Sequence, residues 1–477
     1  MTDYTVTAAR RYSELHSGFR LVTAVEAAIP VSWLTLDLVA LERKPLPVVE
    51  EFTLRLCQQG MDTIPGIAAV LGLDDNVVRT AVANQLSAET LDYRLTRRPD
   101  GKAVRTIRLT ETGVQAATDL NTTTPQRVEQ NNAFDRLLWV PTEHTKTDLI
   151  SRDQAQAAGR VLLPASRTRE VATADVTPRA LNTLISESEE HVRSSSRLTN
   201  SSTQLEVLAV EAITRQPRRY LPVVLLVFSA LDFDEIRLSV VVDDLTSEPH
   251  SSALQAAGGS DKLGITVAAP VGEPPLPTHL QEQRVPYDTV RGLQRRADNT
   301  RPGNPPAQKD AVPDDSATAR AELNALTVRS VPTFEHRELL AKALSEPRRR
   351  LLLITSHIAD AVVDQALANK MDVLLRRQGF SAHIAYRAAT GGEGERRLRR
   401  LAERYANLTL IALSHEVPHC LIFDDTWINS AFDWLSYCGG PDLVYRAEEG
   451  TLVRAVDLVR HRYDEAVALI EVSANND

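Results

Sequence analysis

The chain has 477 residues, enough for about three domains of ordinary size. Hydrophobic residues make up 43% of it and charged residues 25%, values typical of a globular protein with buried cores. No apolar run approaches the ~20 residues of a membrane span, and the first residues lack the apolar stretch of a secretory signal. We therefore expect a cytoplasmic protein without membrane contact. Its three cysteines are too few for a disulfide framework or a structural zinc site.

The formal net charge of −9 excludes a histone-like coat of nucleic acid, although local basic patches remain available to it. Only seven of the 54 basic residues are lysines. Together with the abundant alanine and valine, this arginine excess indicates a GC-rich bacterial genome.

Residues 41–120 carry a series of short elements. Apolar side chains at helical spacing predict helices over 46–60, 63–73 and 74–88. Strand-like runs at 91–97 and 104–110 flank Pro99-Asp100-Gly101-Lys102, a strong hairpin turn, and another helix follows. Three helices and a two-stranded wing resemble the winged helix-turn-helix domains of bacterial regulators. We therefore expect a winged helix at about 41–120, within an N-terminal region of residues 1–120.

The wing is better supplied for DNA than the third helix. That helix offers Arg79, Asn84 and Gln85 beside two aspartates, whereas base reading usually needs several such side chains. Arginines and a lysine crowd the wing and suit phosphates, which favours nonspecific contact with duplex DNA. Sequence-specific operator binding and a purely structural role remain alternatives. The candidate DNA-binding residues here are Arg79, Arg97, Arg98, Lys102 and Arg105.

Two less regular regions follow. Residues 121–245 contain a buried element at 134–141 and strand-like runs at 220–232 and 235–244, which predict a middle α+β domain. Residues 246–331 are rich in proline, glycine, serine and charge, so we expect a flexible linker, interrupted by a short helix near 287–296.

Residues 332–477 alternate strands with helices, which predicts a three-layer α/β/α domain. The whole chain is then an α/β and α+β multidomain protein. The segments HRELLAKAL, LLLITSHI, LLRRQGFSAHIAY, LIFDD and SAFDWLSYCGG resemble the phospholipase D-like (HKD) phosphodiesterase domains of bacterial nuclease and defence proteins. The segment from Ser430 to Tyr437 carries the most specific part of this resemblance.

The resemblance implies a metal-free site with a nucleophilic histidine, a lysine two residues on and an aspartate five beyond the lysine. A full site takes two such motifs, commonly from two subunits, which implies a homodimer. Here the pattern is broken: counting from His419, leucine and threonine occupy the other two positions. Taking Asp424 as the aspartate puts Val417 at the nucleophile and His419 at the lysine. We therefore expect a degenerate domain that needs no cofactor, with His419 and Asp424 as remnants.

Other interpretations of this region concern metal, nucleotide and DNA. His415, His419, Cys420 and Asp424 match no known metal-site spacing, so no metal is expected. The glycine-rich turn at 391–394 lacks the lysine of a phosphate-binding loop. The basic helix after it is either a solvated face paired with glutamates or a phosphate contact surface. Its candidate DNA-binding residues are Arg396, Arg397 and Arg400.

These features predict a noncatalytic, DNA-associated subunit of a bacterial anti-phage defence or genome-maintenance complex, with duplex DNA and other proteins as partners. One alternative is an active phospholipase D-like nuclease with a diverged motif, in which His419 attacks and arginines replace the lysine. The other is a winged-helix transcription regulator.

Overall fold

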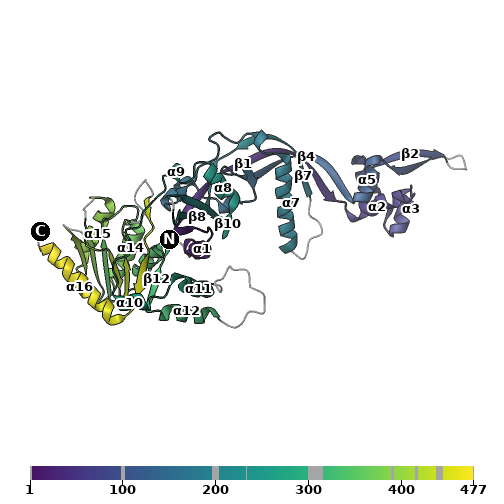
Figure 1. The fold of residues 1–477 in the computed structure, drawn as a ribbon. Coiled ribbons are helices and arrows are strands. Elements are labelled where there is room, and N and C mark those ends of the chain that lie inside the picture. Colours follow the sequence, from purple (N-terminus) through teal and green to yellow (C-terminus); the bar gives the residue numbers. More distant parts are fainter. Residues whose placement is uncertain are drawn as a thin grey trace.

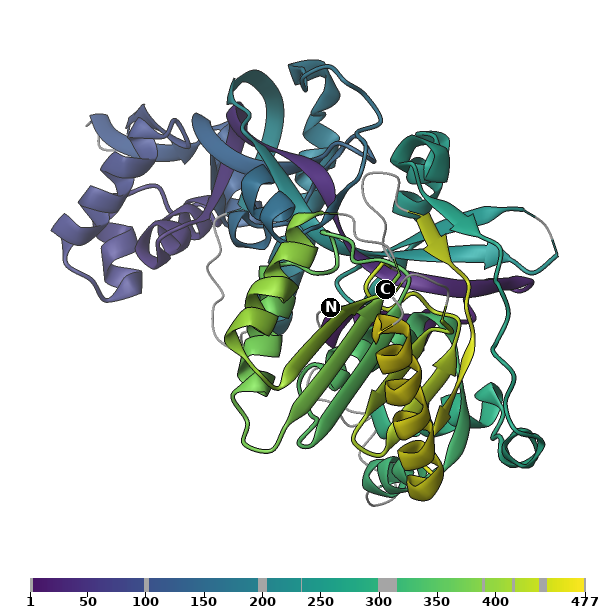
Figure 2. The same ribbon diagram turned by 90° about the vertical axis from the view of Figure 1, so that its left-hand side faces the viewer.

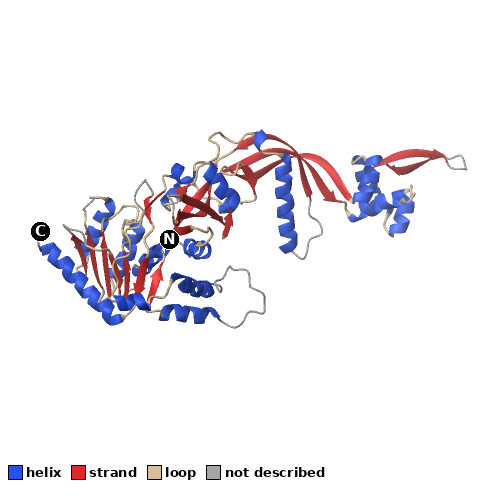
Figure 3. Ribbon diagram, in the orientation of Figure 1, coloured by secondary structure: helices blue, strands red, loops and turns tan. Residues whose placement is uncertain are grey.

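A computed structural model describes residues 3–97, 103–195, 204–232, 234–298, 315–387, 391–413, 417–436 and 444–475. The protein is a mixed α/β molecule whose strands form several sheets. It is elongated, with a small helical module at one end and a seven-stranded sheet at the other (Figure 1, Figure 3).

One 27-residue strand, β1 (Phe19–Pro45), organises an eight-stranded sheet that we call the N-terminal sheet. Its first half pairs with β8 (Arg218–Ala230), and its second half pairs with β4 (Asn121–Asp135) and β7 (Gln204–Arg215). The remaining strands are β5 (Val140–Thr142), β6 (Val161–Leu162), β9 (Ile236–Val242) and β10 (Leu245–Ser247). Helices α1 (Asp3–Tyr12), α6 (Arg152–Ala157), α7 (Pro178–Ser195), α8 (Glu248–Ala256) and α9 (Gly259–Leu263) accompany them.

Residues 46–120 form a module inserted between β1 and β4. Pro45 pairs with Asn121 in the β1–β4 ladder, so the chain leaves and re-enters the sheet at one point. The module has its own buried core, which includes Leu54, Ile67 and Val82. We call it the arm-tip module, because the β1–β4 ribbon carries it away from the rest of the molecule (Figure 1). Its elements are α2 (Val48–Gln58), α3 (Ile64–Leu71), α4 (Asp75–Ser87), β2 (Leu91–Arg97), β3 (Ala103–Leu109) and α5 (Glu111–Asp119).

The C-terminal sheet has the strand order β12-β19-β17-β16-β13-β14-β15, and only its last three strands run parallel. Apolar side chains cover both faces, one packed with α13, α14 and α15 and the other with α16 (Figure 2). The strands are β12 (Val328–Val331), β13 (Arg350–Thr355), β14 (Ser381–Tyr386), β15 (Leu408–Ala412), β16 (Cys420–Phe423), β17 (Thr426–Ser430) and β19 (Gly450–Val453). The helices are α13 (His336–Ala343), α14 (Gln365–Leu375), α15 (Glu393–Arg404) and α16 (Val456–Asn475).

The region expected to be a flexible linker differs from that expectation wherever the structure describes it. Leu254, Ile265, Leu280 and Val290 are all buried there. The sequence is poor in apolar residues, but pairing between segments supplies the packing: β11 pairs in parallel with the distant β18, and α11 packs against α12 within the same region. Residues 299–314 lie outside the described residues. The elements are β11 (Thr266–Ala268), α10 (Thr278–Gln283), α11 (Tyr287–Asp298), α12 (Asp315–Ala325) and, far along the chain, β18 (Val444–Arg446).

Residues on each side of the expected domain boundary near residue 332 pack with the sheet on the other side of it. Tyr445 and Ala447, in the C-terminal third, are buried in the core of the N-terminal sheet. In the other direction, β12 precedes the expected boundary and pairs with β19 at the edge of the C-terminal sheet. The expected boundary therefore does not divide the chain into two separately packed parts.

Candidate functional site

Helix α4, which stands where a winged helix has its recognition helix, has Asn84 and Gln85 engaged within the module. The Asn84 amide donates to Glu50 Oε1 at 2.8 Å, and the Gln85 amide donates to Glu50 Oε2 at 2.5 Å. Gln85 is also only 2% exposed. Of the three side chains expected to face bases, Arg79 alone is exposed and outside this network. A base edge needs free donors and acceptors, so α4 is poorly equipped to read sequence.

The β2–β3 hairpin presents arginines on both of its faces. Arg94, Arg105 and Arg108 are exposed. The guanidinium of Arg105 lies 3.6 Å from the centre of the Tyr93 ring, a cation–π contact that holds it in place. Arg108 pairs with Asp92 at 3.3 Å. In the described part of the chain, no carboxylate lies within ion-pair distance of Arg94. Arg97 is the last residue of β2, and Arg98 and Lys102 lie outside the described residues.

The arginines of α15 lie on a surface that carries its own carboxylates. Glu393 lies 2.6 Å from Arg400, 3.5 Å from Arg396 and 3.9 Å from Arg397. Arg397 also donates to the carbonyl oxygen of Val363 at 3.0 Å. This helix and the β2–β3 hairpin lie at opposite ends of the molecule (Figure 1). The structure therefore does not bring the two groups of predicted DNA-binding residues together.

The glycine-rich turn before α15 uses its amides internally. The Gly394 N–H donates to Asp360 Oδ1 at 2.7 Å, and the Gly391 N–H donates to Glu395 Oε2 at 2.9 Å. The Gly394 contact holds the pKa of Asp360 below its usual range. Burial would raise the pKa of Glu395, but hydrogen bonds from Arg399 and then from Gly391 hold it below its usual range. An anion approaching this helix N-terminus would have to displace the protein's own carboxylates.

His419 and Asp424, expected from the sequence as remnants of a phosphodiesterase motif, lie at opposite ends of β16. His419 precedes the strand, and its Nδ1 donates to the carbonyl oxygen of Ala431 at 2.8 Å. Asp424 follows it in the turn to β17, with a φ of 46°. Its carboxylate accepts the backbone N–H groups of residues 348 and 349 at 2.9 Å and of residue 350 at 3.2 Å. Asp424 is therefore a turn residue, and the pair forms no common site.

A polar cluster missed from the sequence lies where β13 ends. Asp433, 5% exposed, accepts hydrogen bonds from the hydroxyls of Thr355 and Ser356 and, at 3.2 Å, from the Ser356 N–H. His357 Nδ1 lies 2.7 Å from Ser356 Oγ and 3.6 Å from Asp433 Oδ2, and this side chain is 52% exposed. A serine–histidine pair directly after a buried strand was the available signal, because ligands bind beyond the carboxyl ends of parallel strands. No sequence signal indicated that Asp433, 77 residues away from Ser356, would form hydrogen bonds with it.

His336, the first residue of helix α13, has a structural role beside the C-terminal sheet. His336 is fully buried and stacks on Phe432 with the ring centres 4.6 Å apart. Its Nδ1 donates to the carbonyl oxygen of Thr333 at 3.1 Å, and its Nε2 lies 2.8 Å from Ser430 Oγ. Burial lowers the pKa of His336 to about 4, so the ring is neutral at pH 7.

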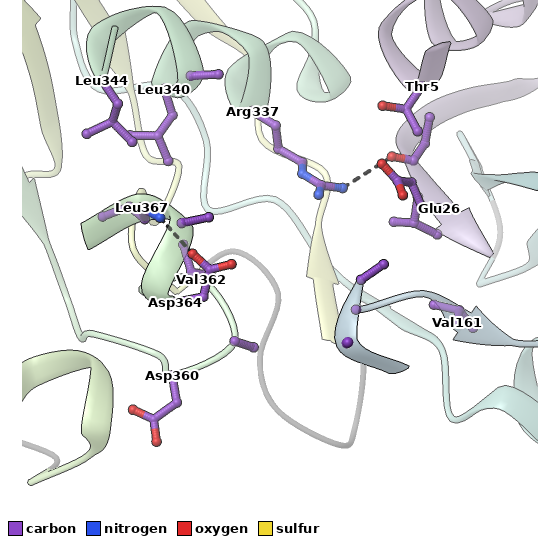
Figure 4. Close-up of a pocket in the computed structure, with 18 of the residues that line it drawn as sticks. Thr5, Glu26, Val161, Arg337, Leu340, Leu344, Asp360, Val362, Asp364 and Leu367 are labelled. Carbon is purple, nitrogen blue, oxygen red and sulfur yellow. Dashed lines mark hydrogen bonds between the residues drawn. The ribbon is translucent and has the colours of Figure 1, made fainter. Parts of the chain in front are cut away.

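A cavity of about 640 Å³ lies between β1 and the helices α13 and α14 (Figure 4). Arg337 reaches across it and donates to the carbonyl oxygen of Ala24 at 3.2 Å. Glu26 pairs with Arg160 at 3.0 Å, and Asp364 caps α14 through the Leu367 N–H at 2.8 Å. None of the predicted site residues lines this cavity. Among these groups, Arg337 links α13 to β1, whereas Asp364 and Glu26 contact neighbours on their own side of the cavity.

The residues that the structure describes contain no group of three or more histidine, cysteine, aspartate or glutamate side chains arranged to hold a metal ion. They also contain no helix with the length and apolar character needed to cross a bilayer. His415, part of the metal cluster considered from the sequence, lies outside them.

No family model matches the chain, and no curated protein matches it. Solved structures are similar over parts of it. TrmBL2, an archaeal chromatin protein that binds DNA, is 16% identical, with 33% of this chain and 61% of that one covered and a TM-score of 0.24. NucT from Helicobacter pylori is 11% identical over 31% of this chain and 96% of that one, with a TM-score of 0.24. Phosphatidylserine synthase from Haemophilus influenzae Rd KW20 is 13% identical over 31% and 39%, with a TM-score of 0.23. Similarities at these scores assign neither a family nor an activity.

Proposed function

We propose that this chain is a noncatalytic, DNA-associated protein that holds duplex DNA by its backbone through the β2–β3 hairpin, the wing of a winged-helix module. The observation that carries the proposal is a contrast within that module. The hairpin exposes Arg94 and Arg105 at the end of a long arm, whereas on α4 Glu50 occupies Asn84 and Gln85 and leaves Arg79 as the one exposed candidate. Guanidinium groups contact phosphates whatever the base sequence is, so this arrangement gives affinity without sequence reading.

The local charge supports the same conclusion. Residues 91–110 contain six basic residues, among them Arg97, Arg98 and Lys102, against two aspartates. The surrounding chain is acidic, with a net charge of −9, so the hairpin is the part of the module that a polyanion approaches most favourably. The arginines of α15 share Glu393, and we assign them a smaller part in binding than the hairpin.

Fluorescence anisotropy with the full chain tests this proposal. Two labelled duplexes of unrelated sequence are titrated at several salt concentrations. We expect similar affinities for both, several-fold weaker binding by the Arg94→Ala/Arg105→Ala variant, and a slope of log K against log salt shallower by about 1–2. The matched control is Arg152→Ala/Arg179→Ala, two exposed arginines on α6 and α7. Equal losses in both variants, or a strong preference for one duplex, would contradict the proposal.

We further propose that the C-terminal domain has a phospholipase D-like fold and has lost the phosphodiesterase activity. The support is that His419 bonds a backbone carbonyl and Asp424 holds a turn at the other end of β16. The same contacts weigh against an active nuclease built on His419. The engagement of Asn84 and Gln85 by Glu50 weighs against a sequence-reading transcription regulator.

The biological setting is a proposal that rests on the family resemblance: a cytoplasmic, homodimeric subunit of a bacterial anti-phage defence or genome-maintenance complex. Plating phage on the native host and on a deletion strain tests the first setting. Complementation with the wild-type gene restores resistance, and complementation with the Arg94→Ala/Arg105→Ala gene does not. Equal plaque counts with and without the gene would contradict a role in anti-phage defence. Light scattering of the purified chain tests the dimer.

A further inference from the structure

The arm-tip module exposes apolar side chains where α3 turns into α4. Val70 is 55% exposed, Leu73 38% and Val77 45%, all within eight residues of sequence. Three large apolar side chains left in water at one turn are unfavourable unless something covers them. We call this turn, from Val70 to Val77, the apex.

The apex is well ordered by its own contacts. Gly72 takes a left-handed conformation with a φ of 66°, and the Leu73 N–H donates to the carbonyl oxygen of Ala68 at 3.1 Å. The Asp74 side chain then caps α4 by accepting from the Asn76 N–H at 2.8 Å. The exposed side chains are thus presented on a fixed backbone, which lowers the entropy cost of binding.

The charge at the apex has the sign opposite to that of the hairpin. Asp74 and Asp75 are both exposed at the N-terminus of α4, the part of a recognition helix that would enter a DNA groove. Residues 46–90 contain six acidic residues against two arginines. Phosphates are therefore repelled at the apex and attracted at the hairpin, so one module carries two surfaces of opposite charge.

We propose that the apex docks a partner protein through a basic, amphipathic helical segment, with the apolar side chains of that segment on Val70, Leu73 and Val77 and its lysines or arginines beside Asp74 and Asp75. Charge complementarity selects this partner over DNA. This surface adds to the DNA contact proposed above and does not depend on it, because the two use different elements.

The test uses the full chain and a defined probe, a labelled 18-residue helical peptide with leucines along one face and lysines along the other. Its twin has glutamate in place of every lysine. We expect the lysine peptide to bind in a salt-sensitive manner and the glutamate peptide to bind at least tenfold more weakly. Leu73→Ser/Val77→Ser should weaken lysine-peptide binding at least tenfold. Leu95→Ser/Val114→Ser removes apolar side chains outside the apex that are more exposed than Leu73 and Val77, and it should leave lysine-peptide binding unchanged.

A second variant separates charge from packing. Asp74→Asn/Asp75→Asn keeps an N-cap residue, since asparagine caps as well as aspartate, and removes the charge. We expect it to weaken the lysine peptide several-fold and to abolish most of the salt dependence. The hairpin variant Arg94→Ala/Arg105→Ala should bind the peptide normally, and the apex variants should bind DNA normally.

Three results would overturn the proposal. The first is equal binding of both peptides, or binding that neither apex variant changes. The second is a loss of DNA affinity in Leu73→Ser/Val77→Ser, which would make the apex part of the DNA surface. The third is a concentration-dependent increase in mass of the chain alone that this variant removes, which would make a second copy the occupant.

Discussion

The backbone N–H of Leu46 donates a 3.0 Å hydrogen bond to the carbonyl oxygen of Leu120. This bond lies just beyond the pairing of Pro45 with Asn121 and closes the ladder between β1 and β4. The 73 residues between the two leucines therefore begin and end at one point of the ribbon. The arm-tip module is a domain inserted into a hairpin.

Replacing residues 46–120 by Asn-Gly should leave a folded protein. The β1–β4 strands are then joined by a two-residue hairpin loop, which matches the twist of antiparallel strands. We expect the shortened chain to keep cooperative thermal unfolding, measured by circular dichroism, and to lose duplex binding in the anisotropy assay. A shortened chain that is unfolded at 25 °C would show that the module is needed to hold the two strands together.

The purified full chain should not hydrolyse DNA or a generic phosphodiester in the presence of a chelator. His419 is held by the carbonyl of Ala431, and no lysine accompanies it in the motif. The measurement is release of a chromogenic phenol, compared with buffer alone. Turnover that disappears in His419→Ala would restore the nuclease interpretation. Turnover that survives there and disappears in His357→Ala would instead locate chemistry at the cluster around Asp433.

Trp434→Ala should destabilise the C-terminal sheet by about 3–5 kcal/mol, because a fully buried indole is replaced by a cavity. The ring contacts Phe432 edge-on with the centres 5.1 Å apart. Within the described chain, the Trp434 nitrogen has no hydrogen-bond partner. Trp434→Phe should therefore cost less than half as much, since it removes volume and no hydrogen bond. Urea unfolding followed by circular dichroism measures both, and equal losses would contradict this account.

The free energy of unfolding should fall by about 3 kcal/mol more in the wild type than in His336→Gln as the pH drops from about 6.5 to about 4. Burial lowers the pKa of His336 to about 4 in the folded chain, whereas an unfolded histidine binds protons from about 6.5 downward. Acid therefore favours the unfolded chain across that window. Urea titrations at a series of pH values measure the two curves. Parallel curves would show that His336 does not titrate as a buried group.

The helices and strands of the arm-tip module were predictable because their signals are local. Asp74 precedes an apolar repeat as a cap should, and Pro99 to Lys102 marks a turn between two strand patterns. Strand β1 was not predictable as one element. It is buried on both sides over much of its length, so it lacks the alternation that identifies a half-exposed strand. The insertion followed from pairing between residues some 75 positions apart, which no local pattern records.

The candidate site residues show the same difference between features with local sequence signals and features that depend on long-range packing. Composition alone indicated the basic hairpin, and counting residues led to the expectation of a broken phosphodiesterase motif. The engagement of Asn84 and Gln85 by Glu50, and of Ser356 by Asp433, depends on which elements pack together. Residues 246–331 were expected to be a flexible linker because composition measures only what a segment can bury by itself. Leu254 is buried in the core of the N-terminal sheet, among residues of β1 and β8.

The position of Tyr445 has a consequence for how the protein folds while it is being synthesised. Its side chain completes a core that β1, near the N-terminus, begins. At about 5–20 residues per second, a ribosome needs roughly 20–80 seconds to make the intervening chain. During that time the arm-tip module can fold from its own residues and β1 can pair with β4 and β8, but the apolar core that Tyr445 completes stays partly exposed. Exposed apolar surface of this kind is what molecular chaperones bind, so we expect newly made chains to depend on them.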